Sequence, residues 1–409
     1  MQEHKLKSRD ITSFKDLKNY CESEEFKGWD PYDGLNSKVF KATGFQHWDL
    51  ARLAWIQGFK RSPINFRKLL LVPKEFNSKG IGLFLSGYCN LYKIAKSGDT
   101  SFGTKEEFLE KICFLSDLLI EKQSKNYSGA CWGYNFDWQA RRLFLFPKET
   151  PTVVATTFCA SALFEAYEIT KEKKYLETAL SSANFIVNDL NRTRHNEGIL
   201  FSYSPLNGNN TVYNASLLGT KLLSICYKYT GKEEYKNLAR LSVMAACKGQ
   251  REDGSWIYGL LPVQSWIDSF HTGYNLDAIQ FYQENTGDTA FKDNIREGFD
   301  FYISNFFKED GTPKYYHDKT YPIDIHCPAQ LFVTLSRLDR FNQYRGLASK
   351  VLDWSIKNMQ DRKGFFYYQL KKGISSKISY MRWSNAFMFN AMSHYLLEDQ
   401  KMKNAVAID

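Results

Sequence analysis

The chain has 409 residues, and its 54 basic and 45 acidic side chains leave a formal net charge of +9. Aromatic residues make up 16% of the chain and charged residues 24%, which excludes disorder, collagen and coiled coil as descriptions of the whole chain. Because no run of about 18 apolar residues occurs, no transmembrane helix is expected. The first residues lack the apolar core of a signal peptide, so we expect a cytoplasmic protein.

The charge is expected to be spread along the chain, not gathered in one Lys/Arg tract, and no nucleic-acid partner is predicted. Eight cysteines are scattered without C-x-x-C spacing and are expected to be small buried side chains. The His and Cys spacings predict no metal site, and no phosphate-binding or dinucleotide-binding glycine motif occurs. We therefore expect neither a metal nor a cofactor.

Helices are predicted in chain order from the first residues onward. Residues 1–44 are expected to form an arm and a first helix that packs on the rest, and 45–59 is the clearest early helix. A pair of helices follows at 80–93 and 105–122. A glycine–aromatic signature then recurs, beginning at Gly129, Gly198, Gly254, Gly311 and Gly364, with spacings of 69, 56, 57 and 53 residues. That period fits one pair of antiparallel helices with two connections.

The polarity of the runs between these signatures alternates. Runs with charges on one side precede the signatures, at 174–190, 233–247, 290–306 and 344–359. More uniformly apolar runs follow them, at 152–167, 212–229, 272–284, 325–338 and 381–396. Such alternation predicts an outer layer of amphipathic helices around an inner layer of buried ones.

The inner candidates are 45–59, 81–94, 152–167, 212–229, 272–284 and 325–338, with 381–396 as a seventh or as the partner that closes the ring. The predicted fold is all-α with little β structure, a single (α/α)6 toroid over residues 1–409. An open helical solenoid is the alternative, but its repeats of about 34 or 40–47 residues are shorter than those found here.

In such a toroid the starts of the inner helices meet at one face. Three carboxylates are predicted there, Asp137, Asp268 and Asp324, and carboxyl pairs cleave glycosidic bonds. His271 and His326 stand one repeat apart, so we expect them side by side, where a histidine would abstract a proton from a sugar carbon. The structural alternatives are helix N-caps for the aspartates and hydrogen-bonded packing for the histidines.

The same face is predicted to bind an oligosaccharide or polysaccharide, including an acidic one. Aromatic rings cover the apolar faces of sugars, and polar side chains bond the hydroxyl groups; for any single aromatic residue, loop packing is the alternative. The predicted binding residues are Trp132, Tyr134, Trp138, Gln139, Arg141, Tyr213, Asn214, Trp256, Tyr274, Asn275, Gln330, Arg382 and Trp383, with Asp30 and Asp33 reaching in from the N-terminal arm.

Five segments carry a resemblance to a known group of proteins. They are Trp132-Gly-Tyr-Asn-Phe-Asp137-Trp138-Gln139, Thr150-Pro151-Thr152, Tyr321-Pro-Ile-Asp324-Ile-His326-Cys-Pro-Ala-Gln330, Arg382-Trp383 and Asp30-Pro-Tyr-Asp33-Gly-Leu35. They resemble bacterial proteins encoded in capsule and exopolysaccharide biosynthesis clusters. The resemblance covers nearly the whole chain and implies a six-hairpin, glycosidase-like toroid that works on a surface polysaccharide or its precursor. It assigns no catalytic residue.

The leading hypothesis is a carbohydrate-active enzyme. A hydrolase would use Asp137, Asp268 and Asp324, whereas a lyase or epimerase would use His271, Tyr274 and Arg382 with Asn214. A non-catalytic glycan-binding or scaffold protein is the second hypothesis. A third is an isoprenoid-processing toroid, because residues 250–256 resemble the Gln/Trp repeat of triterpene cyclases, although the D-x-D-D acid motif of those enzymes is missing.

Overall fold

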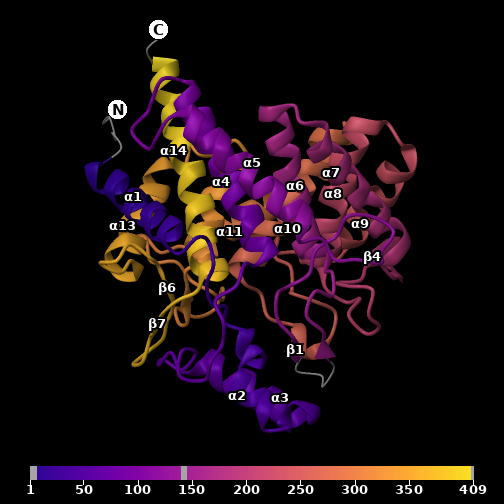
Figure 1. Ribbon diagram of the computed structural model, residues 1–409. Coiled ribbons are helices and arrows are strands. Elements are labelled where there is room, and N and C mark those ends of the chain that lie inside the picture. Colours follow the sequence, from indigo (N-terminus) through magenta and orange to yellow (C-terminus); the bar gives the residue numbers. More distant parts are fainter. Residues whose placement is uncertain (1–6, 140–144, 407–409) are drawn as a thin grey trace.

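The structure is a computed structural model that describes residues 7–139 and 145–406, and helices dominate it (Figure 1). Among these residues six helices form an inner ring: α4 (Ser78–Lys96), α6 (Val153–Thr170), α8 (Tyr213–Thr230), α10 (Ser269–Thr286), α12 (His326–Arg337) and α14 (Phe387–Val406). Each packs against the next, and α14 packs against α4. The ring is therefore closed, and the predicted (α/α)6 toroid is confirmed.

The outer layer consists of the amphipathic helices. Five of them, α5 (Lys105–Glu121), α7 (Lys173–Asn184), α9 (Glu233–Lys248), α11 (Lys292–Phe306) and α13 (Arg345–Met359), pack against the inner helix that precedes them in the chain. The sixth outer place is taken by α1 (Ser8–Ser23), which contacts α13 and α14. The two ends of the chain thus close the toroid together.

The expectation that 45–59 is an inner helix is wrong. This run lies in an insertion between α1 and α4 that holds η1 (Asp33–Asn36), α2 (Lys38–Ala42), η2 (Phe45–His47) and α3 (Asp49–Arg61), at one end of the barrel (Figure 1). Only Ile56 and Phe59 of α3 are buried, whereas Leu50 is 70% exposed. An apolar run of this length fits both environments, so its composition did not distinguish them. The run at 381–396 supplies the sixth inner helix instead.

Short strands and turns connect the helices. β1 (Trp138–Gln139) pairs with β2 (Leu145–Phe146), and β3 (Arg192–His195) with β4 (Gly198–Phe201), both antiparallel. A three-stranded antiparallel sheet has the order β5 (Ile323–Asp324), β6 (Tyr367–Leu370) and β7 (Ser376–Ser379), with Asp324 opposite Gln369. The other short helices are η3 (Phe185–Asp189), η4 (Pro262–Gln264) and η5 (Met381–Ala386), and η5 leads directly into α14.

The glycine–aromatic signatures fasten each hairpin to its neighbours. The buried indoles of Trp132 and Trp256 donate to the carbonyls of Leu119 and Ala246, near the ends of α5 and α9, at 2.8 and 2.9 Å. A side chain at Gly254, where φ is +85°, would lie 2.4 Å from the backbone oxygen of Glu297 on α11. The two tryptophans therefore pack the hairpins, which corrects their predicted role in sugar binding.

The described part of the chain holds no helix that is both long and apolar enough to span a membrane. The eight cysteines are free, and all but the half-buried Cys113 are buried.

Candidate active site

Partly exposed aromatic side chains form a continuous group at the end of the barrel where the inner helices begin. The ring of Tyr32 lies 5.8 Å from that of Trp383 and 6.0 Å from that of Trp138. Trp138 contacts Tyr203, whose hydroxyl is 3.3 Å from that of Tyr134. These residues, together with Tyr258 and His271, whose rings are 4.7 Å apart, are called the mouth below.

His271 lies in the first turn of α10 and is held by Asp268. The Asp268 carboxylate caps the helix by accepting from the backbone N–H of His271 at 3.1 Å, and it lies 2.7 Å from Nδ1 of the same residue. A carboxylate can only accept, so this contact places a proton on Nδ1, and in the neutral form of the ring Nε2 is then the acceptor. The His271 side chain is 21% exposed, whereas that of Asp268 is fully buried. Asp268 is thus both an N-cap and a positioning residue for His271.

His326 is the first residue of α12 and lies beside His271, as their spacing predicts. The Phe270 ring stacks on His326 at 4.2 Å and touches His271 at 4.3 Å. Nε2 of His326 is 2.5 Å from the Tyr274 hydroxyl, and Nδ1 has no partner among the described residues. Burial, helped by the nearby Lys79, holds the pKa of His326 well below its usual value, so the ring is neutral at pH 7.

Asp324 holds other mouth residues in place. Its carboxylate accepts from the His326 backbone N–H, from Trp383 Nε1 and from Gln369 Nε2 at 3.0, 2.9 and 3.2 Å. Burial raises its pKa to about 6, and its side chain has no solvent contact. This corrects the prediction that Asp324 acts on a glycosidic bond, because a buried carboxylate with three donors positions Trp383 instead.

Asp137 belongs to a separate group. It accepts from the backbone N–H of Lys148 at 2.7 Å and so fixes the loop around β1 and β2. The three predicted catalytic aspartates therefore have different local hydrogen-bond partners.

Arg382 is committed to an internal ion pair. Its guanidinium donates to both carboxylate oxygens of Asp30, at 2.5 and 2.8 Å, and each side chain is 4% exposed. Asp33 is likewise paired with buried Arg67 at 2.7 Å. The first pair joins the insertion to the barrel and the second lies within the insertion. Because both pairs are buried, Arg382, Asp30 and Asp33 are not free to bind substrate, contrary to the prediction.

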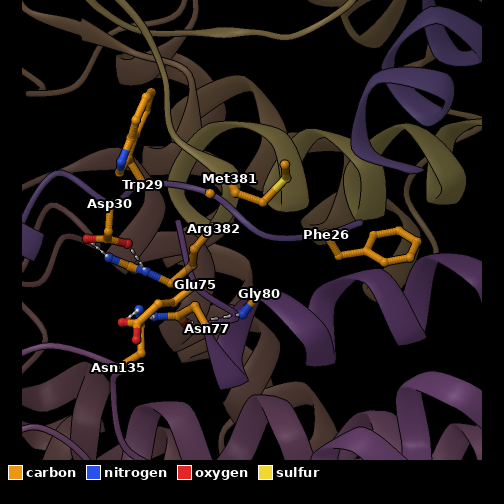
Figure 2. Close-up of a pocket in the computed structure, with 10 residues that line it drawn as sticks. Phe26, Trp29, Asp30, Glu75, Asn77, Gly80, Asn135, Met381 and Arg382 are labelled. Atoms are coloured by element: carbon orange, nitrogen blue, oxygen red, sulfur yellow. Dashed lines mark hydrogen bonds and ion pairs between the residues drawn. The ribbon is translucent and has the colours of Figure 1, made fainter. Parts of the chain in front are cut away.

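A small pocket lies beside the Asp30–Arg382 pair (Figure 2). Glu75, Asn77 and Asn135 line it together with Gly80. Asn135 donates to Glu75 at 3.3 Å, and Asn77 donates to Asn135 at 2.7 Å. These polar groups thus bond one another across the junction between the insertion and α4.

The other predicted residues are distributed as follows. Tyr134, Trp138 and Trp383 reach the mouth, whereas Tyr213 bonds His195 at 3.0 Å on the β3–β4 side and Gln330 bonds Thr334 within α12. Gln139 is buried and accepts from Arg52 at 2.8 Å, and Asn214 and Asn275 are buried with a side-chain oxygen that has no partner in the part of the chain that the structure describes. Arg141 lies outside the described residues.

Two lysines at this end of the barrel escaped the sequence analysis. Lys79, in the first turn of α4, is 4% exposed, and its Nζ lies 4.2 Å from the ring centre of Phe158, 4.9 Å from that of Phe387 and 5.5 Å from that of Tyr274. Burial lowers its pKa well below the usual value. Its position at the start of an inner helix indicates a site residue by the same criterion that selects His271.

Lys60 of α3 also reaches the mouth, where its Nζ donates to the Tyr32 hydroxyl at 2.6 Å. No sequence signal links Lys60 to this site, because the apolar pattern of 45–59 predicts an inner helix of the ring.

No protein-family profile matches the chain, and no curated protein matches it significantly. Among solved structures, an unsaturated glucuronyl hydrolase specific for heparin is similar, with TM-score 0.61 and 13% identity, covering 97% of each chain. Cellobiose 2-epimerase from Bacillus thermoamylovorans has TM-score 0.58 and 14% identity, over 78% of this chain and 89% of its own. A GH76 α-mannanase from Bacteroides thetaiotaomicron has TM-score 0.58 and 13% identity, over 80% and 87%.

The likeness is one of fold. All three neighbours are six-hairpin, glycosidase-like toroid enzymes, and this chain shares their (α/α)6 architecture. Across residues 7–139 and 145–406, no group of three or more His, Cys, Asp or Glu is placed to hold a metal ion.

Proposed function

We propose that this protein is a carbohydrate-active enzyme that moves a proton at a sugar carbon, as an epimerase or a lyase does. One observation carries the proposal. His271 is partly exposed among aromatic rings, its Nδ1 is held by the buried Asp268, and its Nε2 is an acceptor. A histidine oriented by a carboxylate in this way is suited to act as a general base near neutral pH.

Hydrolysis is less well supported by the same geometry. Glycosidic cleavage needs two carboxyl groups that flank the scissile bond. Here the side chains of Asp268 and Asp324 are buried behind His271 and Trp383, where each is saturated by donors from its own surroundings. Beside His271, the mouth presents aromatic rings and Lys60, and neither of these buried carboxylates.

The residues around His271 would support proton abstraction next to a carbonyl or carboxylate group. Burial raises the pKa of Tyr258, so its hydroxyl keeps its proton and would donate a hydrogen bond to the oxygen on which negative charge develops. The ring of Tyr274 lies 5.9 Å from that of His271 and its hydroxyl contacts His326, so this pair would carry a proton between the two faces of the site. Lys60, and not Arg382, would meet a substrate anion.

For the substrate we propose a bacterial surface polysaccharide or a precursor of one. The aromatic mouth suits a sugar ring, and the resemblance to capsule-cluster proteins points to the same class of polymer. The structural neighbours are named for cellobiose, heparin and mannan, which is consistent with a glycan ligand.

The test is incubation of the protein with reducing oligosaccharides and uronate oligosaccharides in D₂O. Deuterium incorporated at a sugar carbon, detected by NMR, is the expected result for an epimerase, and an unsaturated product absorbing in the ultraviolet is expected for a lyase. His271→Gln should abolish either signal, whereas His47→Gln, which changes an exposed histidine of the insertion, should not. New reducing ends without deuterium or unsaturation would contradict the proposal in favour of a hydrolase.

Glycan binding without turnover is the second candidate, favoured by the aromatic composition of the mouth. In that case Trp383→Ala would weaken oligosaccharide binding in calorimetry. His271→Gln would leave binding unchanged, and no substrate in the panel would react.

A further inference from the structure

The insertion carries an exposed apolar surface. Of the large hydrophobic side chains that are exposed in residues 7–139 and 145–406, eight lie between residues 39 and 71, and the other seven are scattered over the rest. The eight are Val39, Phe45, Trp48, Leu50, Ile64, Phe66, Leu69 and Leu71, with exposed fractions from 37% to 74%. Exposed apolar side chains concentrated in one segment are typical of a surface that meets another phase or molecule.

The insertion does not need these side chains for its own packing. Leu35, Phe40 and Ile56 form its small core, against which Trp55 and Trp138 pack. On α3, Ile56 and Phe59 are buried, whereas Leu50, Ala54 and Gly58 are exposed. Leu50, Ala54 and Gly58 thus lie on the side of α3 opposite to its core.

The same stretch holds most of the net charge of the chain. Residues 37–74 contain eight Lys and Arg residues and one acidic residue, Asp49, against a net charge of +9 for the whole chain. This corrects the expectation that the charge is evenly spread. Lys38, Lys41, Arg61 and Lys68 are exposed, and no ion pair joins any of them to a described residue.

We propose that this surface, residues 37–74, docks onto an anionic lipid bilayer. Exposed bases alternate with exposed apolar residues at intervals of one to three positions, as in Lys38–Val39, Arg61–Ile64 and Lys68–Leu69. Bases attract anionic headgroups, while Trp, Phe and Leu side chains enter the boundary between headgroups and acyl chains. An acidic polymer would engage the bases but would leave the aliphatic side chains in water, so the lipid surface fits both halves of the pattern.

The position of the insertion gives this docking a consequence. Lys60 of α3 and Tyr32 reach the mouth, and the Asp30–Arg382 pair joins the insertion rigidly to the barrel. Docking would therefore hold the mouth close to the membrane surface. This inference stands on the exposed residues of the insertion and does not depend on the proposed catalytic function.

The experiment is flotation of the full chain with vesicles of phosphatidylcholine alone and with about 30% phosphatidylglycerol. We expect binding to the anionic vesicles and at least tenfold weaker binding to the neutral ones. Raising the salt concentration from about 50 to about 300 mM should weaken binding further, because the headgroup attraction is screened. Lys41→Glu/Lys68→Glu should lower partitioning more than tenfold, since each base contributes about fivefold.

Trp48→Ser/Leu69→Ser changes only apolar contacts and should also lower partitioning at least tenfold. All four changed positions are exposed, and the matched control is Leu109→Ser/Phe114→Ser on α5, whose side chains are 36% and 50% exposed. The control should bind like the parent chain.

Three results would overturn the proposal. One is no binding to anionic vesicles by the folded parent chain. Another is equal binding by the parent and both insertion variants. The third is that the parent chain does not bind vesicles but self-associates in light scattering as its concentration rises, and that Trp48→Ser/Leu69→Ser abolishes this self-association. That result would make this surface an interface between two copies.

Discussion

Two basic side chains lie against helices across the axis of the barrel, and they differ in the partners that surround them. Near the far ends of the inner helices, Arg337 of α12 pairs with Glu165 of α6 on the other side of the ring at 2.8 Å. Near the mouth, Lys79 of α4 lies against aromatic rings from α6, α10 and α14, with no ion pair to a described residue. Arg337 thus has an ionic partner, whereas the buried Lys79 has none among the described residues.

The pKa values follow this difference. Burial opposes ionisation of Glu165, but the charges of Arg337 and Lys93 outweigh it and lower the pKa of Glu165 to about 2. At the mouth, burial without a matching charge lowers the pKa values of Lys79 and His326. Since an unpaired buried polar group costs free energy, polar groups of this kind are usually found at functional sites. The deeper layer is built for stability, and the mouth is where chemistry is expected.

The largest expected effect is the loss of turnover when His271 is replaced. His271→Gln should lower turnover by about 10² to 10⁴-fold, the usual contribution of a general base, with little change in melting temperature, since the side chain is partly exposed and the Asp268 cap binds its backbone. Turnover on the substrate found in the D₂O assay measures this. Equal turnover by the variant would remove the base from the mouth and leave binding as its role.

Breaking an ion pair in the deeper layer should instead lower the free energy of unfolding. Lys221 and Asp277 pair at 2.6 Å, with side chains 11% and 6% exposed, so Asp277→Asn should cost about 3 kcal/mol by leaving a buried cation unpaired. Urea unfolding followed by circular dichroism measures the loss. The double change Lys221→Met/Asp277→Leu should recover most of it. A single variant as stable as the parent would show that the pair is not a structural support.

A buried histidine of α14 should make the stability of the chain depend on pH. Burial, with the charge of Arg337, holds the pKa of His394 well below 6.5 in the folded chain. Below that pH the unfolded chain takes up a proton that the folded chain does not, so stability is lost as the pH falls through 6.5.

Relative to His394→Gln, the parent chain should therefore lose about 1 kcal/mol of stability between about pH 6.5 and about pH 5.5, because the unfolded histidine is already half protonated at the upper pH. Unfolding free energies of both chains at the two pH values test this, because other titrating groups cancel in the difference. A difference independent of pH would refute it.

The smallest expected effect is a gain in stability. Lys79→Met replaces an unpaired buried amine by an apolar side chain of similar length, so stability should rise by about 1 kcal/mol while turnover falls. Thermal unfolding and the turnover assay measure the two changes. Lys96→Met, at an exposed position of the same helix, should alter neither. A loss of stability in Lys79→Met would place this lysine with the supporting charges of the deeper layer.

The local pattern of the chain predicted the layers of the barrel and the pairing of two histidines. Polarity alternates helix by helix, and one repeat separates His271 from His326, so both results follow from periodicity alone. The same reasoning misjudged Trp132 and Trp256. A signature that recurs in every hairpin is more readily explained by a contact that every hairpin makes, and both indoles bond the preceding outer helix.

The sequence by itself determined the closed ring of helical hairpins, because the periodic burial of apolar faces depends only on residue order. The tertiary structure decided which polar groups are free. Arg382 and Asp30 are 352 residues apart and meet only when α1 and α14 close the ring, which removes both from the set of ligand-binding groups. It also decided that α3 lies outside the barrel with its apolar residues exposed, since the six inner places are filled without it.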